Sequence, residues 1–212
     1  CMLAQSPSLP GFMGTLSFCV EEAVKEVGGT KNLYDGDIII YNNPYGSGSH
    51  SQDAAIVKPI FYNSNLVGYS AIKAHWLDTG GKEPYSTDTV DIFQEGTIFP
   101  GLKLYSKGEL VEDVYKLIIA NTRVPKAIIG DLNAQLNGVK AGANALKRII
   151  NKFGYDLFYH DPTNQNIVNY GKDESISIPI IFGVKTNPSP LFVIGFEIGA
   201  RYALTDNIDG SK

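Results

Sequence analysis

The chain has 212 residues, of which 43% are hydrophobic, and its formal net charge is −4. This composition predicts one or two globular domains with real cores, and the interspersed charges exclude the basic footprint of a nucleic-acid-binding protein. The sequence lacks both a run of about 18 apolar residues and a signal-peptide pattern, so neither a transmembrane helix nor secretion is predicted. Two cysteines, Cys1 and Cys19, indicate reduced thiols in a cytoplasmic protein. We interpret the start at Cys1, without an initiator Met, as a truncation.

A helix and a buried strand are predicted first. Residues 15–27 carry apolar side chains at helical spacing, and Gly28-Gly29 is a suitable end for that helix. Residues 37–41 are almost all apolar, which is typical of a buried strand. A loop rich in Asn, Pro, Gly and Ser follows over residues 42–50.

A β-hairpin is predicted next. Two apolar runs, 54–62 and 66–76, flank the turn sequence Asn63-Ser64-Asn65. Residues 79–88 are polar and contain glycine, so we expect a loop there.

Two more helices are predicted before residue 154. Ser106 and Glu109 have the spacing of a capping box and precede an apolar periodic stretch. Asp131 is a good N-cap for a further helix that runs to Phe153, where Gly154 would end it.

The pattern changes after Gly154. Apolar residues alternate with small or polar ones over 175–184 and 192–202, around a turn that contains Asn187-Pro188. The spacing fits a hairpin of a transmembrane β-barrel and, equally, an amphipathic hairpin of a soluble sandwich. We therefore predict an α+β fold, with a mixed sheet and about three packed helices over residues 1–154 and a β-hairpin tail over 155–212.

Two histidines and a carboxylate are candidate metal ligands. His50 and Asp53 form one His-x-x-Asp motif, and His75 begins a second one that ends at Asp78. Because a hairpin returns its end to its beginning, His75 can lie beside His50 and Asp53. Two His and one carboxylate bind divalent first-row metals and leave positions open for substrate. The alternative is a surface His50 and a half-buried His75 held by a backbone carbonyl. Asp78 is a fourth ligand, a partner that orients His75, or a turn residue, and we favour the last two of these roles.

Other polar residues have two interpretations each. Glu95 is either an acid/base group or a carboxylate at the start of a loop. Arg123 is either an anion-binding side chain or a partner in an ion pair. Asp131 is better explained as an N-cap than as a catalytic group, and Gly46-x-Gly48 is too short for a nucleotide-binding loop.

Residues 1–154 resemble the hydantoinase B/oxoprolinase family, which includes N-methylhydantoinase B subunits, parts of 5-oxoprolinase and the large subunits of acetone and acetophenone carboxylases. The matching blocks, in the family's order, are Leu3-Ala4-Gln5, Gly36-Asp37, Asn42-Asn43-Pro44-Tyr45, Gly48-Ser49-His50-x-x-Asp53, Ala74-His75-x-x-Asp78-x-Gly80-Gly81, Glu95-Gly96, Asn121-x-Arg123-x-Pro125 and Gly130-Asp131-Leu132. Four positions, Asn43, Ser47, Ser49 and Trp76, depart from the family pattern and affect the expected substrate specificity.

The resemblance implies a function. The metal ligands of the carboxylase members correspond to His50, Asp53 and His75, and the metal would be Mn, Zn or Fe. ATP would be bound by a partner subunit of the hydantoinase A type, in a cytoplasmic hetero-oligomer. The small-molecule substrate would be a hydantoin, oxoproline or a ketone, and the reaction hydrolysis or carboxylation. The resemblance names no general base.

Residues 155–212 resemble outer-membrane β-barrel proteins of Bacteroidetes that are associated with type IX secretion. This likeness implies a joined or chimeric chain with its junction near Gly154, and it leaves His160 in a loop without a metal role. The alternative functions are therefore a secretion-associated structural protein of the outer membrane, in which the tail would contact a membrane, and an inactive scaffold fragment.

Overall fold

The computed structural model describes residues 3–4, 10–47, 50–85 and 87–153, together with the backbone of four short strands after residue 174. The chain divides into two compact units, and the unit that spans Gly14–Tyr159 contains all the candidate site residues. Each unit is described by itself.

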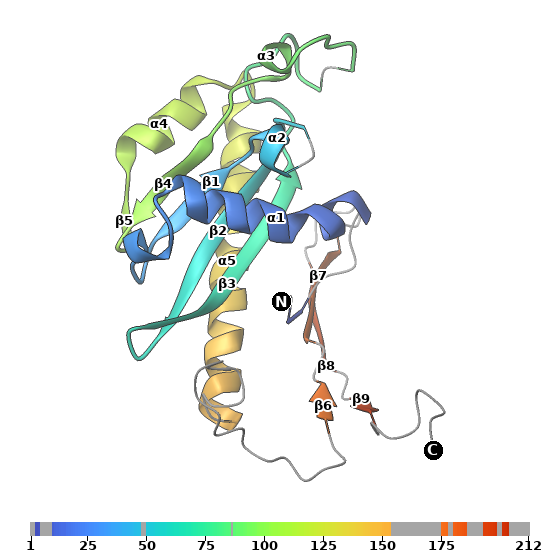
Figure 1. Ribbon diagram of the computed structural model, residues 1–212. Helices are drawn as coiled ribbons and strands as arrows, with labels where there is room; N and C mark the ends of the chain where they lie inside the picture. Colours follow the sequence, from blue (N-terminus) through green and yellow to red (C-terminus); the bar gives the residue numbers. More distant parts are fainter. Residues whose placement is uncertain are drawn as a thin grey trace. The chain divides into compact units, whose positions relative to one another are not determined.

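The main unit is built on a five-stranded antiparallel sheet (Figure 1). Its strands, in the spatial order β3-β2-β1-β4-β5, are β3 (Asn65–His75), β2 (Asp53–Tyr62), β1 (Ile38–Tyr41), β4 (Pro100–Ser106) and β5 (Glu109–Leu110). β3 is therefore one edge of the sheet, and the short β5 is the other.

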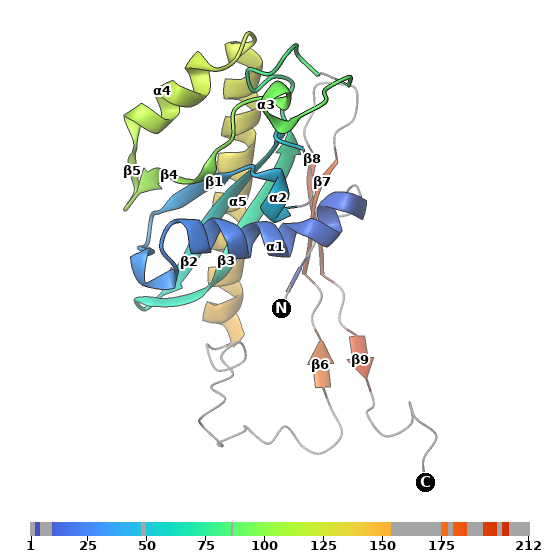
Figure 2. The same ribbon diagram turned by 45° about the horizontal axis from the view of Figure 1, so that its top comes forward.

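Helices cover both faces of this sheet, which gives three layers (Figures 1 and 2). Helix α1 lies across one face, while α4 and α5 pack on the other. The helices are α1 (Pro10–Glu26), the 3-10 turn η1 (Thr30–Asn32), α2 (Pro44–Ser47), α3 (Ile92–Glu95), α4 (Glu112–Ala120) and α5 (Pro125–Phe153). Among the helices in the described ranges, none is both long and apolar enough to cross a bilayer.

Strand β1 shows why the sheet has two cores. Its four residues are all buried, and successive side chains point to opposite faces. Ile38 and Ile40 join the core beneath α4 and α5, whereas Ile39 and Tyr41 join the core beneath α1. Full burial of such a side chain contributes about 1.5–3 kcal/mol. A strand that serves two cores is continuously apolar, and this pattern made β1 recognisable in the sequence.

The predicted hairpin of β2 and β3 is confirmed. Asn63 and Ser64 have positive φ angles of 49° and 66°, as a two-residue turn with the twist of the flanking strands requires. The pairing runs from Tyr62 opposite Asn65 to Asp53 opposite His75. The hairpin therefore places the first residue of β2 beside the last residue of β3.

The predicted capping box at Ser106 and Glu109 is wrong. These two residues face each other across a β-turn that joins β4 to β5. Lys107 and Gly108 take positive φ angles of 52° and 93°, so the chain turns back as a hairpin instead of starting a helix. The helix itself is present, but α4 begins at Glu112.

The N-cap predicted at Asp131 is also wrong, because α5 begins at Pro125, six residues earlier. Proline suits the first turn of a helix, where its missing N–H has no helical partner. Asp131 therefore lies inside the helix. α5 does extend to Phe153, as predicted, and eight of its residues are buried, including Ile128 and Ile150.

The tail forms paired strands, as predicted. β7 (Ile180–Lys185) pairs with β8 (Val193–Ile198), and β6 (Ser175–Ser177) pairs with β9 (Arg201–Ala203), all antiparallel. Gly154, the predicted junction, and His160 lie outside the described residues. The two interpretations of the tail depend on side chains outside the described part of the chain, so both stay predictions.

Candidate functional site

Asp53 and His75 form the centre of the candidate site. They are direct cross-strand partners, and His75 Nδ1 lies 2.7 Å from Asp53 Oδ1. The other carboxylate oxygen, Oδ2, accepts a hydrogen bond of 3.1 Å from the backbone N–H of His50. Burial by itself would raise the pKa of Asp53, but the hydrogen bonds from His75 and from the His50 backbone outweigh it and hold this pKa below its ordinary value. Asp53 is therefore a carboxylate at neutral pH.

His50 lies next to this pair. A tight turn brings it there, in which the N–H of Asp53 donates to the carbonyl of His50 at 3.1 Å. The rings of His50 and His75 are 6.4 Å apart between centroids and nearly perpendicular. The side chain of His50 is 68% exposed, against 34% for His75 and 3% for Asp53. The structure thus brings the three predicted residues together, and the His50 side chain is the most exposed of the three.

The donor types suit a divalent metal, but the side chains do not form a ready cage. Among the described residues, no group of three or more His, Cys, Asp and Glu side chains is spaced to hold a metal ion. Nδ1 of His75 is hydrogen-bonded to Asp53, so a metal bound by both side chains would have to replace this hydrogen bond. In addition, the buried hydroxyl of Ser51 has no hydrogen-bond partner in the described part of the chain, and a bound water or ligand would satisfy it.

Glu95 is a fourth member of the site. Its Oε1 lies 3.7 Å from His50 Nδ1, and its Oε2 accepts a hydrogen bond of 3.3 Å from the N–H of Ser51. Its backbone carbonyl accepts 2.8 Å from the side-chain amide of Gln52. The sequence left Glu95 open between two roles, because Glu95 comes 42 positions after Asp53 and the sequence does not show that the two lie close together.

Glycines explain how Glu95 reaches the site. The segments 79–82 and 94–97 lie backbone to backbone, with a β-bridge between Gly80 and Gly96. A Cβ on Gly81 would lie 2.5 Å from the carbonyl oxygen of Glu95, so only glycine permits this approach. Backbone hydrogen bonds join the segments at 2.8 Å, from Thr97 to Thr79, and at 2.7 Å, from Lys82 to Gln94.

Asp78 stabilises the loop and does not contact His75 directly in any described hydrogen bond. Its buried carboxylate accepts from the N–H of Arg123 at 2.5 Å and from the N–H of Gly80 at 3.0 Å. Arg123 Nη1 adds a contact of 3.4 Å, which confirms the ion-pair interpretation of this arginine. Of the roles weighed for Asp78, the turn residue therefore describes it best.

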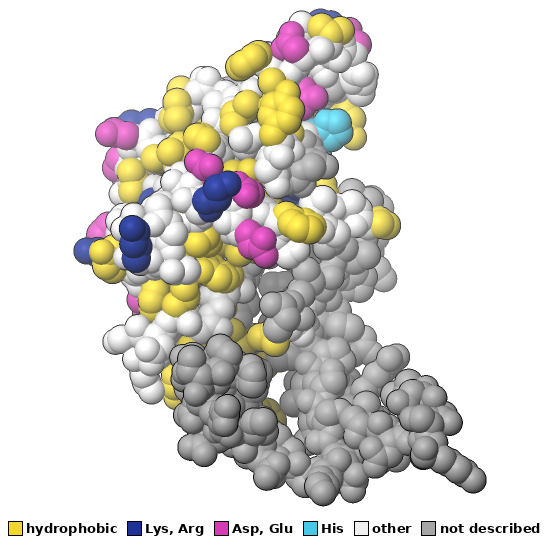
Figure 3. Space-filling model, in the orientation of Figure 1, with side chains coloured by type: hydrophobic (Ala, Val, Ile, Leu, Met, Phe, Trp, Pro, Cys, Tyr) yellow, Lys and Arg dark blue, Asp and Glu magenta, His cyan; other side chains and the backbone are white. Residues whose placement is uncertain are grey.

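One aromatic ring and a buried lysine lie close to the pair. The ring of Tyr85 lies 5.1 Å from that of His75, and the exposed Tyr45 and Phe93 belong to α2 and α3 nearby in the chain. A histidine is visible at the surface among such hydrophobic side chains (Figure 3). Lys73, two residues before His75 on the same side of β3, is only 9% exposed, and its burial lowers its pKa despite the opposing influence of Cys19 and Asp53.

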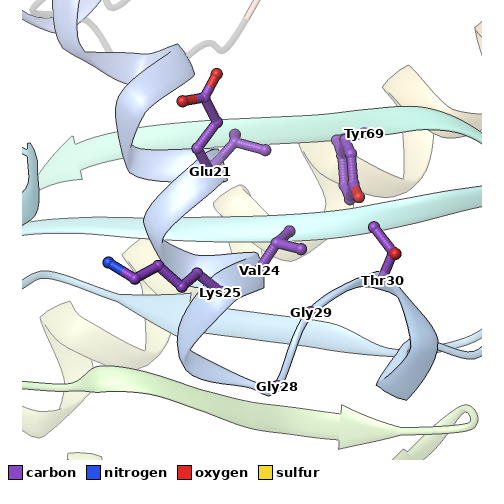
Figure 4. A pocket seen from close by; sticks show the side chains of 8 residues that line it. Glu21, Val24, Lys25, Gly28, Gly29, Thr30 and Tyr69 are labelled. Carbon is purple, nitrogen blue, oxygen red and sulfur yellow. The ribbon is translucent and has the colours of Figure 1, made fainter.

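A shallow groove of about 580 Å³ lies elsewhere, between the C-terminal half of α1 and β3 (Figure 4). Val24 and Tyr69 line it, together with Gly28 and Gly29. It contains none of the four site residues and offers mainly apolar contacts, so we assign the chemistry to the His-Asp cluster.

Two family models match the chain. The model of hydantoinase B/oxoprolinase matches residues 1–166, and that of a domain of unknown function, DUF6089, matches residues 143–212. The two matches overlap between residues 143 and 166.

Individual relatives agree with the first match. The caprolactamase subunit beta of Pseudomonas jessenii is 35% identical over 159 residues, which cover 73% of this chain and 27% of that protein. An uncharacterised protein of Methanocaldococcus jannaschii is 36% identical over 156 residues, which cover 72% of this chain and 28% of that protein. The chain thus spans about a quarter of the length of these two relatives.

Solved structures share the fold. The ATP-dependent caprolactamase of Pseudomonas jessenii superposes with a TM-score of 0.60 at 33% identity, covering 70% of this chain and 25% of that chain. A nucleotide-free acetone carboxylase superposes with a TM-score of 0.61 at 21% identity, covering 70% of this chain and 19% of that chain. The likeness to the carboxylase shows the fold alone.

Proposed function

Because the chain belongs to the hydantoinase B/oxoprolinase family, we propose that residues 1–154 supply the metal-binding part of a B-type subunit in an ATP-dependent enzyme. Its substrate would be a small amide, a lactam such as a hydantoin or oxoproline, or a ketone. The observation that carries this proposal is the convergence of His50, Asp53 and His75 at the paired ends of β2 and β3.

The proposed ligands of a divalent metal, Mn, Zn or Fe, are His50, Asp53 and His75. A bound metal would supply a Lewis acid that stabilises negative charge on a substrate oxygen. Asp53 has both oxygens in hydrogen bonds, yet each oxygen keeps a second lone pair that can bind a metal. Asp53 Oδ1 and His75 Nδ1, which are 2.7 Å apart, lie side by side, and a metal held by both side chains would take the place of the hydrogen bond between them.

A partner subunit completes the proposed enzyme. Among the described residues, we identify no nucleotide-binding loop. We propose that ATP is bound by a hydantoinase A-type subunit in a cytoplasmic hetero-oligomer. Support comes from the relative named as subunit beta of a caprolactamase and from the solved structure described as an ATP-dependent caprolactamase. Hydrolysis and carboxylation both remain within the proposal, since the four site residues suit either reaction.

Elemental analysis tests the metal site. We expect near-stoichiometric Mn, Zn or Fe in the purified full chain and its loss in the double variant His50→Ala, His75→Ala. His160→Ala is the matched control, because it removes the third histidine, which is not among the proposed ligands. If the parent chain takes up none of these metals even after reconstitution, the metal proposal is wrong, and the chain is then better explained as a scaffold fragment.

A further inference from the structure

We propose that Glu95 is a positioning residue for His50, which it holds through Nδ1 so that Nε2 faces the metal position. This inference rests on the proposed function and deepens it. It gives His50 a carboxylate that is not itself a proposed ligand, because Glu95 Oε1 lies 3.7 Å from His50 Nδ1. Carboxylates that orient metal-bound imidazoles in this way are a general feature of metal sites.

The carboxylate of Glu95 is fixed before His50 binds to it. Its Oε2 accepts a hydrogen bond from the N–H of Ser51, the residue that follows His50. The Glu95 carboxylate is therefore held against the backbone directly beside His50. The Glu95 backbone is held by the Gln52 amide at 2.8 Å and by the contact with Gly81. The side chain is only 21% exposed. Glu95 therefore approaches His50 from a rigid frame.

The imidazole of His50 is the part that adjusts. A separation of 3.7 Å is too long for a hydrogen bond, which needs about 2.7–3.2 Å between nitrogen and oxygen. Since its side chain is 68% exposed, little packing opposes a small rotation that closes this gap. Once Nδ1–H donates to Glu95, the lone pair on Nε2 is available, and this is the form in which a neutral imidazole binds metal.

Nitrogen NMR of the isotope-labelled, metal-free chain tests the positioning role directly. Ring nitrogen shifts report which nitrogen of each histidine carries the proton, at a pH well above the ordinary imidazole pKa of about 6.5. We expect His50 to be protonated on Nδ1 in the parent and to lose this preference in Glu95→Ala, while His75 is unchanged. Glu83→Ala is the control, because it removes an exposed glutamate from the loop that precedes α3.

Metal affinity gives the second readout. Titration with Mn²⁺ should show binding about 10- to 100-fold weaker in Glu95→Ala, and an intermediate loss in Glu95→Gln, which keeps an acceptor oxygen. An unchanged His50 proton position in a folded Glu95→Ala variant overturns the inference. If the proton position shifts but neither parent nor variant binds Mn²⁺, the positioning contact stands and the metal proposal fails, so the two failures are distinguishable.

Discussion

The substitution Gln135→Leu should destabilise the main unit by about 3 kcal/mol. Gln135 lies on α5, is 3% exposed, and joins the helix to the hairpin that carries the site. Its Oε1 accepts from the indole N–H of Trp76 at 2.8 Å, and its Nε2 donates to the carbonyls of Ala54 at 2.9 Å and of Ile72 at 3.2 Å. Leucine has nearly the same volume but makes none of these three bonds.

The magnitude follows from the count of bonds. Each intramolecular hydrogen bond contributes about 1 kcal/mol net, which gives about 3 kcal/mol for three bonds. The indole N–H of Trp76, which is 1% exposed, would also lose its partner, and an unsatisfied buried donor costs about 1–3 kcal/mol. For a chain of this size, 3 kcal/mol corresponds to a fall in Tm of about 6–12 °C.

Trp76 makes the assay specific, because it is the single tryptophan in the chain. Urea unfolding followed by Trp76 fluorescence should show a lower midpoint for Gln135→Leu. Asn137→Leu, at an exposed position on the same helix, is the control and should stay within about 0.5 kcal/mol of the parent. If both variants unfold at the parent's midpoint, the inferred role of the Gln135 amide is refuted.

Three further predictions concern buried ionisable groups. Asp78→Ala should lower the free energy of unfolding by about 1–3 kcal/mol, because it leaves the backbone N–H of Arg123 without its acceptor, whereas the half-exposed Arg123 side chain can be solvated; urea unfolding measures this, and an unchanged midpoint would contradict it. Asp37→Ala should lower the free energy of unfolding by about 3–5 kcal/mol, because Asp37 is fully buried and forms an ion pair with Lys103 at 2.7 Å. A second substitution, Lys103→Met, removes the charge left without a partner and should recover part of this free energy. Burial raises the pKa of the Cys19 thiol from 9.0 to about 11. The free energy of unfolding should therefore be constant with respect to this group below pH 9.0 and fall by about 1.4 kcal/mol per pH unit between pH 9.0 and about 11. Cys19→Ala should flatten this profile, and an equally steep fall in that variant would exclude the thiol as its source.

The main unit could be predicted where local patterns determine the structure. The continuous apolar run of β1 and the Asn63-Ser64 turn gave the buried strand and the hairpin, because side-chain period and turn chemistry are properties of adjacent residues. The proximity of Asp53 and His75 followed from the hairpin alone.

Prediction failed where two local signals competed. The Ser106 to Glu109 spacing matched a capping box, but Lys107-Gly108 takes the positive φ angles of a hairpin turn, and pairing with β4 decides between the two. Similarly, Asp131 has the chemistry of an N-cap, yet the proline at position 125 starts α5 earlier, and packing of Ile128 holds the added turn in place.

Glu95 could not be assigned because its role depends on contacts between distant segments. Its approach to His50 needs a glycine at position 81 to admit the backbone of residues 94 and 95, a condition that no periodicity in the sequence expresses. The sequence contains the Glu-Gly pair at 95–96, but only the folded structure shows that Gly96 forms a β-bridge with Gly80.

The hairpin of β2 and β3 has a consequence for how this chain can evolve. The turn lies ten residues from Asp53, or about 33 Å along an extended strand, yet a change of one residue in its length would rotate His75 to the opposite face of the sheet. The strand already accommodates one unmatched residue, since Ile60 pairs with Gly68 while Phe61 pairs with Leu66, which leaves Val67 as a bulge. Insertions and deletions along either arm are therefore tolerated only when a second one, or a bulge, restores the count. The length of this hairpin is therefore constrained by the register of Asp53 and His75, in addition to the constraint that burial places on the β2 side chains.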